Sequence, residues 1–153
     1  MISQTAEYAL RAMAHLASKP TEPQTAQQIA AVTLVPLHYL SKVLQALARA
    51  GLIHSQRGLH GGFTLITPPE ELSVYDIVQA VDPIQRIKRC PLGLAAHGEN
   101  LCPLHKRLDE AMCEVEQCFR ASNLAELLAQ ESSSRPLCPV PMPVTRAAVD
   151  LAD

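Results

Sequence analysis

The sequence is poor in aromatic residues and in charge. Its 153 residues include no Trp, and Phe, Tyr and Trp together make up 3% of the chain. Proteins that bind single-stranded nucleic acids stack the bases on aromatic side chains, so this shortage argues against such a groove. Charged residues make up 18% of the chain, below the roughly 25% of typical soluble domains. Part of the surface is therefore expected to pack against a partner.

Long apolar runs and catalytic motifs are also missing. No stretch of about 18 apolar residues occurs, so no membrane-spanning helix is expected. Residues 1–19 lack the features of a secretory signal, which predicts a cytoplasmic protein. We find no nucleophile–base constellation, and the glycines of residues 58–62 lie in a predicted hairpin rather than before a helix. The sequence therefore predicts neither an enzyme nor a binder of a small-molecule substrate.

The net charge of −2 hides a division of the chain. Residues 1–66 carry five basic and two acidic side chains, whereas residues 67–153 carry eight basic and thirteen acidic ones. Such asymmetry indicates a basic binding part joined to a part of another kind. With so few charges, a chance imbalance is the alternative.

The five cysteines are an odd number, and no export signal accompanies them. A disulfide framework is therefore not expected, and metal binding or redox chemistry are the alternatives to plain burial. The cysteines are Cys90, Cys102, Cys113, Cys118 and Cys138.

The first 66 residues have the pattern of a winged helix-turn-helix. A helix is predicted over residues 3–18, a short helix begins at the Thr25–Gln28 capping box, and a third runs from Pro36 to Gly51. Leu37, Leu40, Leu44 and Leu47 are expected to face the core. Two short strands, 52–57 and 63–66, follow with a glycine-rich turn between them. The fold class is thus mainly α with a small β-hairpin wing.

The remainder is predicted to hold a connecting helix, a loop and a dimerisation helix. A capping box at Ser73–Asp76 begins the connecting helix, and residues 67–100 also include a loop that carries Cys90. Residues 101–130 form the third part, where a helix over about 101–128 has a heptad seam. The seam comprises Leu101, Leu104, Leu108, Ala111, Val115, Cys118, Ser122 and Ala125. Dimerisation is the preferred interpretation, and packing on the chain's own domain is the alternative. Residues 131–153 are predicted to be a disordered tail.

The winged helix-turn-helix pattern predicts which residues contact DNA. His38 and Ser41 lie near the N-terminus of the recognition helix and are expected to contact base edges, with Lys42 and Gln45 placed for phosphate. Arg57, at the entry to the wing, is expected in a minor groove. The predicted set is completed by Thr25, Gln27, Pro36, Tyr39, Ser55 and Gly58. The alternative is a winged helix that binds a protein partner.

Several segments closely resemble the Rrf2 family of bacterial winged-helix transcription regulators. They are HYLSKVLQAL (38–47), AGLIHSQRG (50–58), GGFTL (61–65), EYALRAM (7–13) and VYDIVQAVD (74–82). The resemblance covers about residues 1–130. It implies a homodimer on a pseudo-palindromic site in double-stranded DNA, with the long helices crossing at the dimer interface.

The resemblance also suggests a sensor site. Family members that bind iron–sulfur clusters carry three cysteines at six-residue intervals and then a histidine; this chain has Cys90, Ala96, Cys102 and His105 at those positions, so the middle cysteine is missing. Cys102 and His105 share a face at a predicted helix start, and two thiolates with an imidazole suit iron–sulfur or zinc. The resemblance implies a cluster, of the 2Fe–2S type, with Glu7 of the partner subunit as a further ligand.

Other interpretations of this site stay open. A thiol redox switch, a cofactor-free or partner-controlled repressor, and a zinc or haem site are the alternatives to the cluster. Among the other cysteines, Cys113 is a candidate reserve ligand, Cys118 is expected in a core on the heptad seam, and Cys138 is expected to be incidental.

Overall fold

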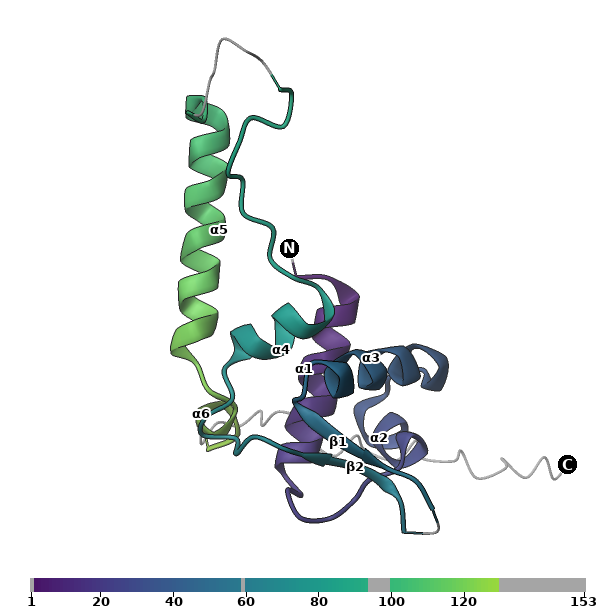
Figure 1. Cartoon of the computed structure of the whole chain (residues 1–153). Coiled ribbons are helices and arrows are strands. Elements are labelled where there is room, and N and C mark those ends of the chain that lie inside the picture. Colours follow the sequence, from purple (N-terminus) through teal and green to yellow (C-terminus); the bar gives the residue numbers. More distant parts are fainter. Residues whose placement is uncertain (1, 59, 94–99, 130–153) are drawn as a thin grey trace, which may run out of the picture.

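The structure is a computed structural model, and it describes residues 2–58, 60–93 and 100–129. Helices α1–α4 and a two-stranded hairpin form one unit, from which α5 extends (Figure 1). The elements are α1 (Gln4–Ala17), α2 (Ala26–Thr33), α3 (Leu37–Arg49), β1 (Ile53–Gln56), β2 (Gly62–Leu65), α4 (Val74–Val81), α5 (Pro103–Ala121) and α6 (Leu124–Ala129). The predicted fold class, mainly helical with a hairpin wing, is confirmed.

Helix α1 forms the centre of the unit and contacts α2, α3, α4, α6 and β2. The Ser3 hydroxyl caps it by accepting the Ala6 N–H at 3.2 Å. Small or slender side chains at helical spacing, including Ala9, Met13 and Leu16, are fully buried. The alanines of this buried face, Ala9 and Ala12, allow the neighbouring helices to approach closely. Both predicted ends, at residues 3 and 18, agree with the caps at Ser3 and Ser18.

The α2–α3 pair is the predicted helix-turn-helix. The capping box joins Thr25 and Gln28 at the start of α2, as expected. Leu34 then adopts the left-handed conformation, with φ at 56°, and turns the chain toward α3. Pro36 immediately precedes α3 rather than lying in its first turn. The expectation that Leu37 faces the core is wrong: it is 41% exposed at the start of α3, and Val43 is buried with the other leucines instead.

The wing is a short antiparallel hairpin in which Ile53 pairs with Leu65 and Gln56 with Gly62. Gly51 ends α3 with φ at 76°, the left-handed conformation expected from its position. The hairpin is fastened to the helices because Gln24 and Phe63 exchange two backbone hydrogen bonds, of 3.1 and 2.8 Å. The buried Gln24 side chain also lies 3.4 Å from His15 of α1. The wing is therefore anchored at its base.

The core extends beyond the first 66 residues. Leu72, Ile77 of α4 and Leu124 of α6 are at most 2% exposed and belong to the same cluster as Met13 and Leu44. The predicted capping box at Ser73 begins α4, which ends at Val81. The hydrophobic core is therefore continuous across residue 66. The predicted boundary there between a DNA-binding part and the rest of the chain stays a prediction about function.

The prediction of one continuous helix over residues 101–128 is wrong. Helix α5 ends at Ala121, Ser122 is extended, and α6 begins at Leu124. Two backbone hydrogen bonds hold the break against the start of α4, from Val74 N–H to the Ser122 carbonyl and from Leu124 N–H to the Leu72 carbonyl, both 2.9 Å. Of the predicted seam, the residues from Leu104 to Cys118 therefore lie in α5, whereas Leu101 precedes that helix and Ala125 lies in α6.

Across the described ranges, no single helix is long and apolar enough to cross a membrane. Helices α2 and α3 pass that test only as a pair, and they are bent by 115° between them. The predicted disordered tail, with Cys138, lies outside the described residues.

Candidate nucleic-acid interface and cysteine–histidine site

The outward side of α3 carries the predicted base and phosphate contacts. His38, Lys42 and Gln45 are exposed, while Leu40, Leu44 and Leu47 hold the other side of the helix in the core. Ser41 is partly exposed, and its hydroxyl donates to the Leu37 carbonyl at 2.9 Å. The Ser41 oxygen therefore remains as an acceptor, which suits an amino group on a base edge.

Tyr39 has a different position from its neighbours. Its ring lies 4.1 Å from the His38 ring and 6.3 Å from the Tyr8 ring of α1, measured between centroids. Half of the side chain is exposed. Tyr39 therefore connects the start of α3 to α1 and orients His38, in addition to any contact with DNA.

The α2 residues of the predicted set differ in what they can contact. The Thr25 hydroxyl is engaged in the capping box with Gln28. Gln27 and Pro36 are exposed, and Gln27 lies in the first turn of α2. In helix-turn-helix proteins the helix before the recognition helix crosses the DNA backbone, so the exposure of Gln27 is compatible with its predicted DNA contact, which stays a prediction.

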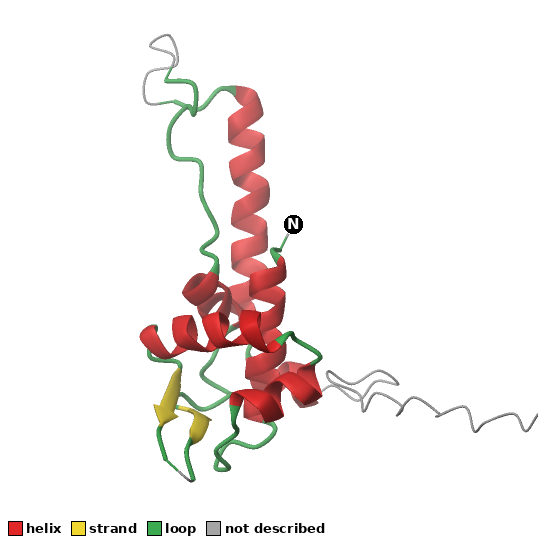
Figure 2. Ribbon diagram, turned by 90° about the vertical axis from the view of Figure 1, so that its right-hand side faces the viewer, coloured by secondary structure: helices red, strands yellow, loops and turns green. Residues whose placement is uncertain are grey.

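The wing residues of the predicted set are solvent-exposed. Ser55, Arg57 and Gly58 lie at or just beyond the end of β1. Gly58 has φ at 115°, a conformation that favours glycine. Figure 2 shows the two strands of the wing at the edge of the helical unit, and β1 of the wing contacts α3. A duplex in contact with α3 would thus lie within reach of Arg57.

Cys102 and His105 are brought together at the start of α5. The Cys102 sulfur lies 3.2 Å from Nδ1 of His105, and Cys102 is the N-cap residue of the helix. A thiolate and an imidazole nitrogen on one tetrahedral zinc or iron lie about 3.6 Å apart, from bond lengths of about 2.3 and 2.1 Å. The pair therefore fits two neighbouring positions of a metal or cluster site.

A complete ligand set is not gathered within a single chain as far as the structure describes it. Residues 2–58, 60–93 and 100–129 contain no group of three or more His, Cys, Asp or Glu side chains that could hold a metal ion. Cys90 is partly buried on the segment after α4, and Ala96 lies outside the described residues. The Cys90–Cys102–His105 set therefore remains a prediction.

Glu7, the predicted ligand from the partner subunit, forms an ion pair with Arg11 of its own helix. Arg11 also donates to the Thr33 carbonyl at 3.1 Å, at the end of α2. Glu7 is thus connected through one side chain to the turn of the helix-turn-helix.

One side of α5 presents large apolar side chains to solvent. Leu104 is 65% exposed, Leu108 44% and Val115 41%. Cys118, on the same predicted seam, is also exposed, so the expectation that it lies in a core is wrong for the single chain. Near the C-terminal end of α5, Phe119 packs against the cluster formed by Ala6 of α1 and Val74 and Val78 of α4.

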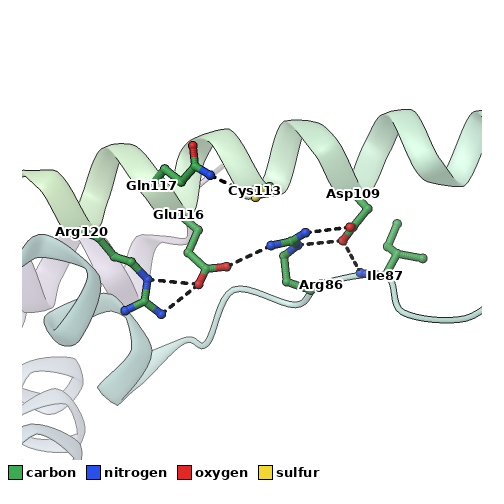
Figure 3. A network of polar contacts seen from close by, with 7 residues as sticks. All are labelled: Arg86, Ile87, Asp109, Cys113, Glu116, Gln117 and Arg120. Carbon is green, nitrogen blue, oxygen red and sulfur yellow. Dashed lines mark hydrogen bonds and ion pairs between the residues drawn. The ribbon is translucent and has the colours of Figure 1, made fainter.

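A charged network on another face of α5 was not predicted from the sequence (Figure 3). Arg86 donates to both oxygens of Asp109 at 2.8 Å and lies 3.4 Å from Glu116. Arg120 pairs with Glu116 at 2.9 Å, and its guanidinium lies 3.4 Å from the ring centroid of Tyr75 in α4. Arg86 thus connects the segment after α4 to α5, and Arg120 connects α5 to Tyr75 of α4.

The network shifts the pKa values of its members. Hydrogen bonding to Asp109 is the largest cause that raises the pKa of Arg86. The Arg86 guanidinium, with the Ile87 N–H, lowers the pKa of Asp109 to about 2, against partial desolvation. Arg120, followed by Arg86, lowers the pKa of Glu116. The sequence contains one hint of this network: Asp109 and Glu116 lie at helical spacing from Cys102 and His105, so all four are expected on one side of the helix.

Comparisons with known proteins agree with this architecture. The family described as "Rrf2: Iron-dependent Transcriptional regulator" matches residues 2–130. The HTH-type transcriptional regulator NsrR of Geobacillus kaustophilus is 32% identical over 137 residues, which cover 86% of this chain and 91% of that protein.

Solved structures share the fold over most of their length. CymR, described as the global cysteine regulator of B. subtilis, has a TM-score of 0.67 and 26% identity, covering 83% of this chain and 95% of its own. IscR of T. potens has a TM-score of 0.71 over 88% of this chain and 91% of its own; at 23% identity it supports the fold alone. The chain belongs to the Rrf2 family, a family of DNA-binding, helix-turn-helix transcription regulators.

Proposed function

We propose that this chain is a homodimeric regulator that binds a pseudo-palindromic operator in double-stranded DNA and senses iron–sulfur or redox status through Cys90, Cys102 and His105. The proposed DNA binding rests on one observation: α3 has an exposed polar side, and Arg57 of the wing is exposed as well. The polar residues on that side of α3 are His38, Lys42 and Gln45. This arrangement suits major-groove contact by α3 and minor-groove contact by the wing.

The apolar face of α5 supports the homodimer. Leu104, Leu108 and Val115 are spaced four and seven residues apart and are each more than 40% exposed in the single chain. Such a row is unfavourable in water and is typical of a helix that packs against a second copy. A dimer through α5 would set the distance between two recognition helices, which must match the half-site spacing of the operator.

The Cys102–His105 pair supports a sensor site. Cys102 lies at the N-terminus of a 19-residue helix, where the helix dipole favours a thiolate, the form that binds metals. In the proposed site Cys90, Cys102 and His105 hold a 2Fe–2S cluster, with Glu7 of the other subunit as a further ligand. The cluster would supply an electron-accepting group whose stability depends on iron and oxidants.

The chain's own residues offer a route from this site to DNA binding. If Glu7 binds the site of the other subunit, its pairing with Arg11 changes, and Arg11 also holds the Thr33 carbonyl. Thr33 is followed by the left-handed Leu34 that sets the angle between α2 and α3. The state of the sensor site would thus alter the position of the recognition helix.

Anaerobic purification tests the sensor part of the proposal. Visible absorption with iron and sulfide analysis is expected to report a cluster, and its removal is expected to change the affinity for an operator duplex found by random-site selection. A colourless, iron-free protein after reconstitution, with unchanged DNA binding, would contradict it. Cys102→Ala is expected to abolish the spectrum and leave a folded dimer.

A cluster-free thiol regulator is the second candidate. It is favoured by the finding that, in the described parts of the chain, no three metal-ligand side chains gather. In that case DNA affinity follows oxidation of Cys90 or Cys102 in iron-free protein. A winged-helix module for a protein partner would show no salt-dependent binding to any duplex.

A further inference from the structure

Helix α5 extends from the rest of its chain and has little apolar contact with it (Figure 1). In the described structure none of its residues is buried, and Phe119, near its C-terminal end, packs on Ala6 of α1 and Val78 of α4. Farther along the helix, a groove of about 550 Å³ lies between α5, the start of α1 and the end of α4. Its apolar lining includes Ile2, Ala6, Ile84, Met112, Val115 and Phe119. Apolar packing within the chain therefore holds one end of α5 and leaves its direction to other contacts.

A second attachment of α5 comes from the segment that follows α4 (Figure 3). Arg86 of this segment donates to both oxygens of Asp109, from Nε and Nη2 at 2.8 Å each, and the Ile87 backbone N–H donates to the same carboxylate at 2.8 Å. A two-pronged arginine–carboxylate pair fixes orientation as well as distance. Asp109 lies twelve residues before the end of α5, which is about 18 Å of helix. The segment therefore holds α5 far from the end that packs on α1 and α4.

The same arginine reaches a second level of the helix. Nη1 of Arg86 lies 3.4 Å from Glu116, which also binds Arg120 at 2.9 Å, and the Arg120 guanidinium lies 3.4 Å from the ring centroid of Tyr75 in α4. The side chains of Asp109 and Glu116 are only 20% and 17% exposed. Isolated exposed ion pairs contribute little, but two-pronged pairs and networks are the exceptions. Arg86 is thus connected to α5 at two levels, in a network that also includes α4.

The direction of α5 matters because the proposed dimer forms through this helix. Leu108, on the exposed apolar face, lies thirteen residues before the end of α5, which is about 20 Å of helix. A tilt of α5 by about 10° would displace Leu108 by about 3 Å, close to the roughly 3.4 Å rise of one base pair. In a dimer this displacement changes the separation of the two recognition helices, which must match the half-sites. A small change in tilt therefore corresponds to a different operator spacing.

We propose that Arg86 fixes the tilt of α5 through Asp109 and Glu116, and so determines which half-site spacing the dimer accepts. This inference rests on the proposed homodimer and its operator, and it adds a residue that determines specificity. Arg86 contacts no DNA in this proposal, since it lies on the segment after α4 and not on α3 or the wing. It is a positioning residue that acts through the two carboxylates of α5.

The test uses the full-length protein and fluorescence anisotropy with a set of labelled duplexes. They are the operator found by random-site selection, the same half-sites moved one base pair closer or one base pair apart, and a single half-site. The variants are Arg86→Gln, Arg86→Lys and Asp109→Asn. Arg107→Gln is the matched control, because the Arg107 side chain is 85% exposed and pairs with Glu110 on its own helix. Sedimentation velocity reports whether each protein is a dimer.

Arg86→Gln and Asp109→Asn are each expected to weaken binding to the selected operator about 3- to 30-fold, the usual range for residues that couple two parts of a protein. Binding to the altered spacings is expected to change less, so that the preference for one spacing falls. Affinity for the single half-site and the dimeric state are expected to be unchanged. Arg86→Lys, which keeps the charge but not the two-pronged pair, is expected between wild type and Arg86→Gln. Arg107→Gln is expected to match wild type.

The outcomes separate this inference from the function on which it rests. A wild-type preference for one spacing that persists in folded Arg86→Gln and Asp109→Asn proteins overturns the positioning role and leaves the dimeric regulator standing. Equal losses on every duplex, the single half-site included, also overturn that role, because they report a general effect on the DNA-binding unit. Wild-type protein that binds the single half-site as tightly as the full operator overturns the proposed dimeric function, and the role of Arg86 with it.

Discussion

Arg11 of α1 donates a 3.1 Å hydrogen bond to the carbonyl of Thr33, the last residue of α2, while it pairs with Glu7 one turn away. A side chain in the central helix thus holds the end of the helix that precedes the recognition helix. Since Thr33 is buried and next to the left-handed Leu34, this contact fixes the angle at which α3 leaves the turn.

Arg11→Ala is expected to lower the free energy of unfolding by about 1 kcal/mol, the usual net value of such a hydrogen bond. Operator affinity is expected to fall by more than the loss of folded protein would explain, because the turn between α2 and α3 loses its hydrogen bond to α1. Lys19→Ala is the control, since Lys19 of the α1–α2 connection pairs only with the exposed Glu22 in the described structure, and such pairs contribute little. Urea unfolding and operator titration measure the two effects; equal operator affinity in both variants would contradict the anchoring role.

Arg57→Ala is expected to weaken operator binding about tenfold or more, because the wing loses its guanidinium in the minor groove. The slope of log affinity against log salt is expected to become shallower by about one per lost contact. Fluorescence anisotropy over a range of salt concentrations measures both. Any cluster spectrum is expected to be unchanged. If Arg57→Ala and Cys102→Ala lose the same property, the division between DNA-binding and sensing parts is wrong.

Leu108→Glu is expected to raise the dimer dissociation constant about 100-fold or more, because burial of an unpaired carboxylate costs several kcal/mol. Gln117→Glu adds the same charge to the opposite, exposed side of α5 and is expected to leave the dimer intact. Sedimentation velocity over a range of concentrations distinguishes the two. A Leu108→Glu protein that remains a dimer would place the interface elsewhere.

The pKa of Asp109 makes part of the stability depend on pH. Because the pKa is lowered from 3.8 to about 2, the folded state binds the Asp109 proton less tightly than the unfolded state does. The contribution is therefore fully present above about pH 4 and is lost as the pH falls toward 2. Urea midpoints of wild type and Asp109→Asn are expected to differ at pH 5 and to converge near pH 2. A constant difference across this range would show that the Asp109 charge is not the cause.

Local sequence signals predicted most of the fold. The capping boxes at Thr25 and Ser73 and the glycine at 51 act within a few residues, and all three elements lie where the pattern placed them. The break after α5 has such a signal too: the Asn123 side chain accepts the Glu126 N–H at 2.8 Å. The break is nevertheless not predicted, because the apolar spacing of the seam continues through it. The burial of Leu124 also depends on a core that includes residues of α1 and α4, which no local pattern reveals.

The candidate site was predicted only in part, for a physical reason. Cys102 and His105 are three residues apart, so helical spacing alone brings them together. The pairing of Arg86 with Asp109 is not predictable from the sequence, because the two residues are 23 positions apart and no local pattern connects them. Pairings of this kind depend on the path of the chain between α4 and α5.

Operator binding measured with and without the metal centre tests the central proposal most directly. Fluorescence anisotropy of a selected operator duplex would compare anaerobically reconstituted protein with the same sample after its iron is removed by a chelator. The proposal predicts salt-dependent binding and at least about a tenfold difference in affinity between the two forms, a coupling of about 1.4 kcal/mol. Equal affinities, with a cluster demonstrably present in one form and absent from the other, would contradict it.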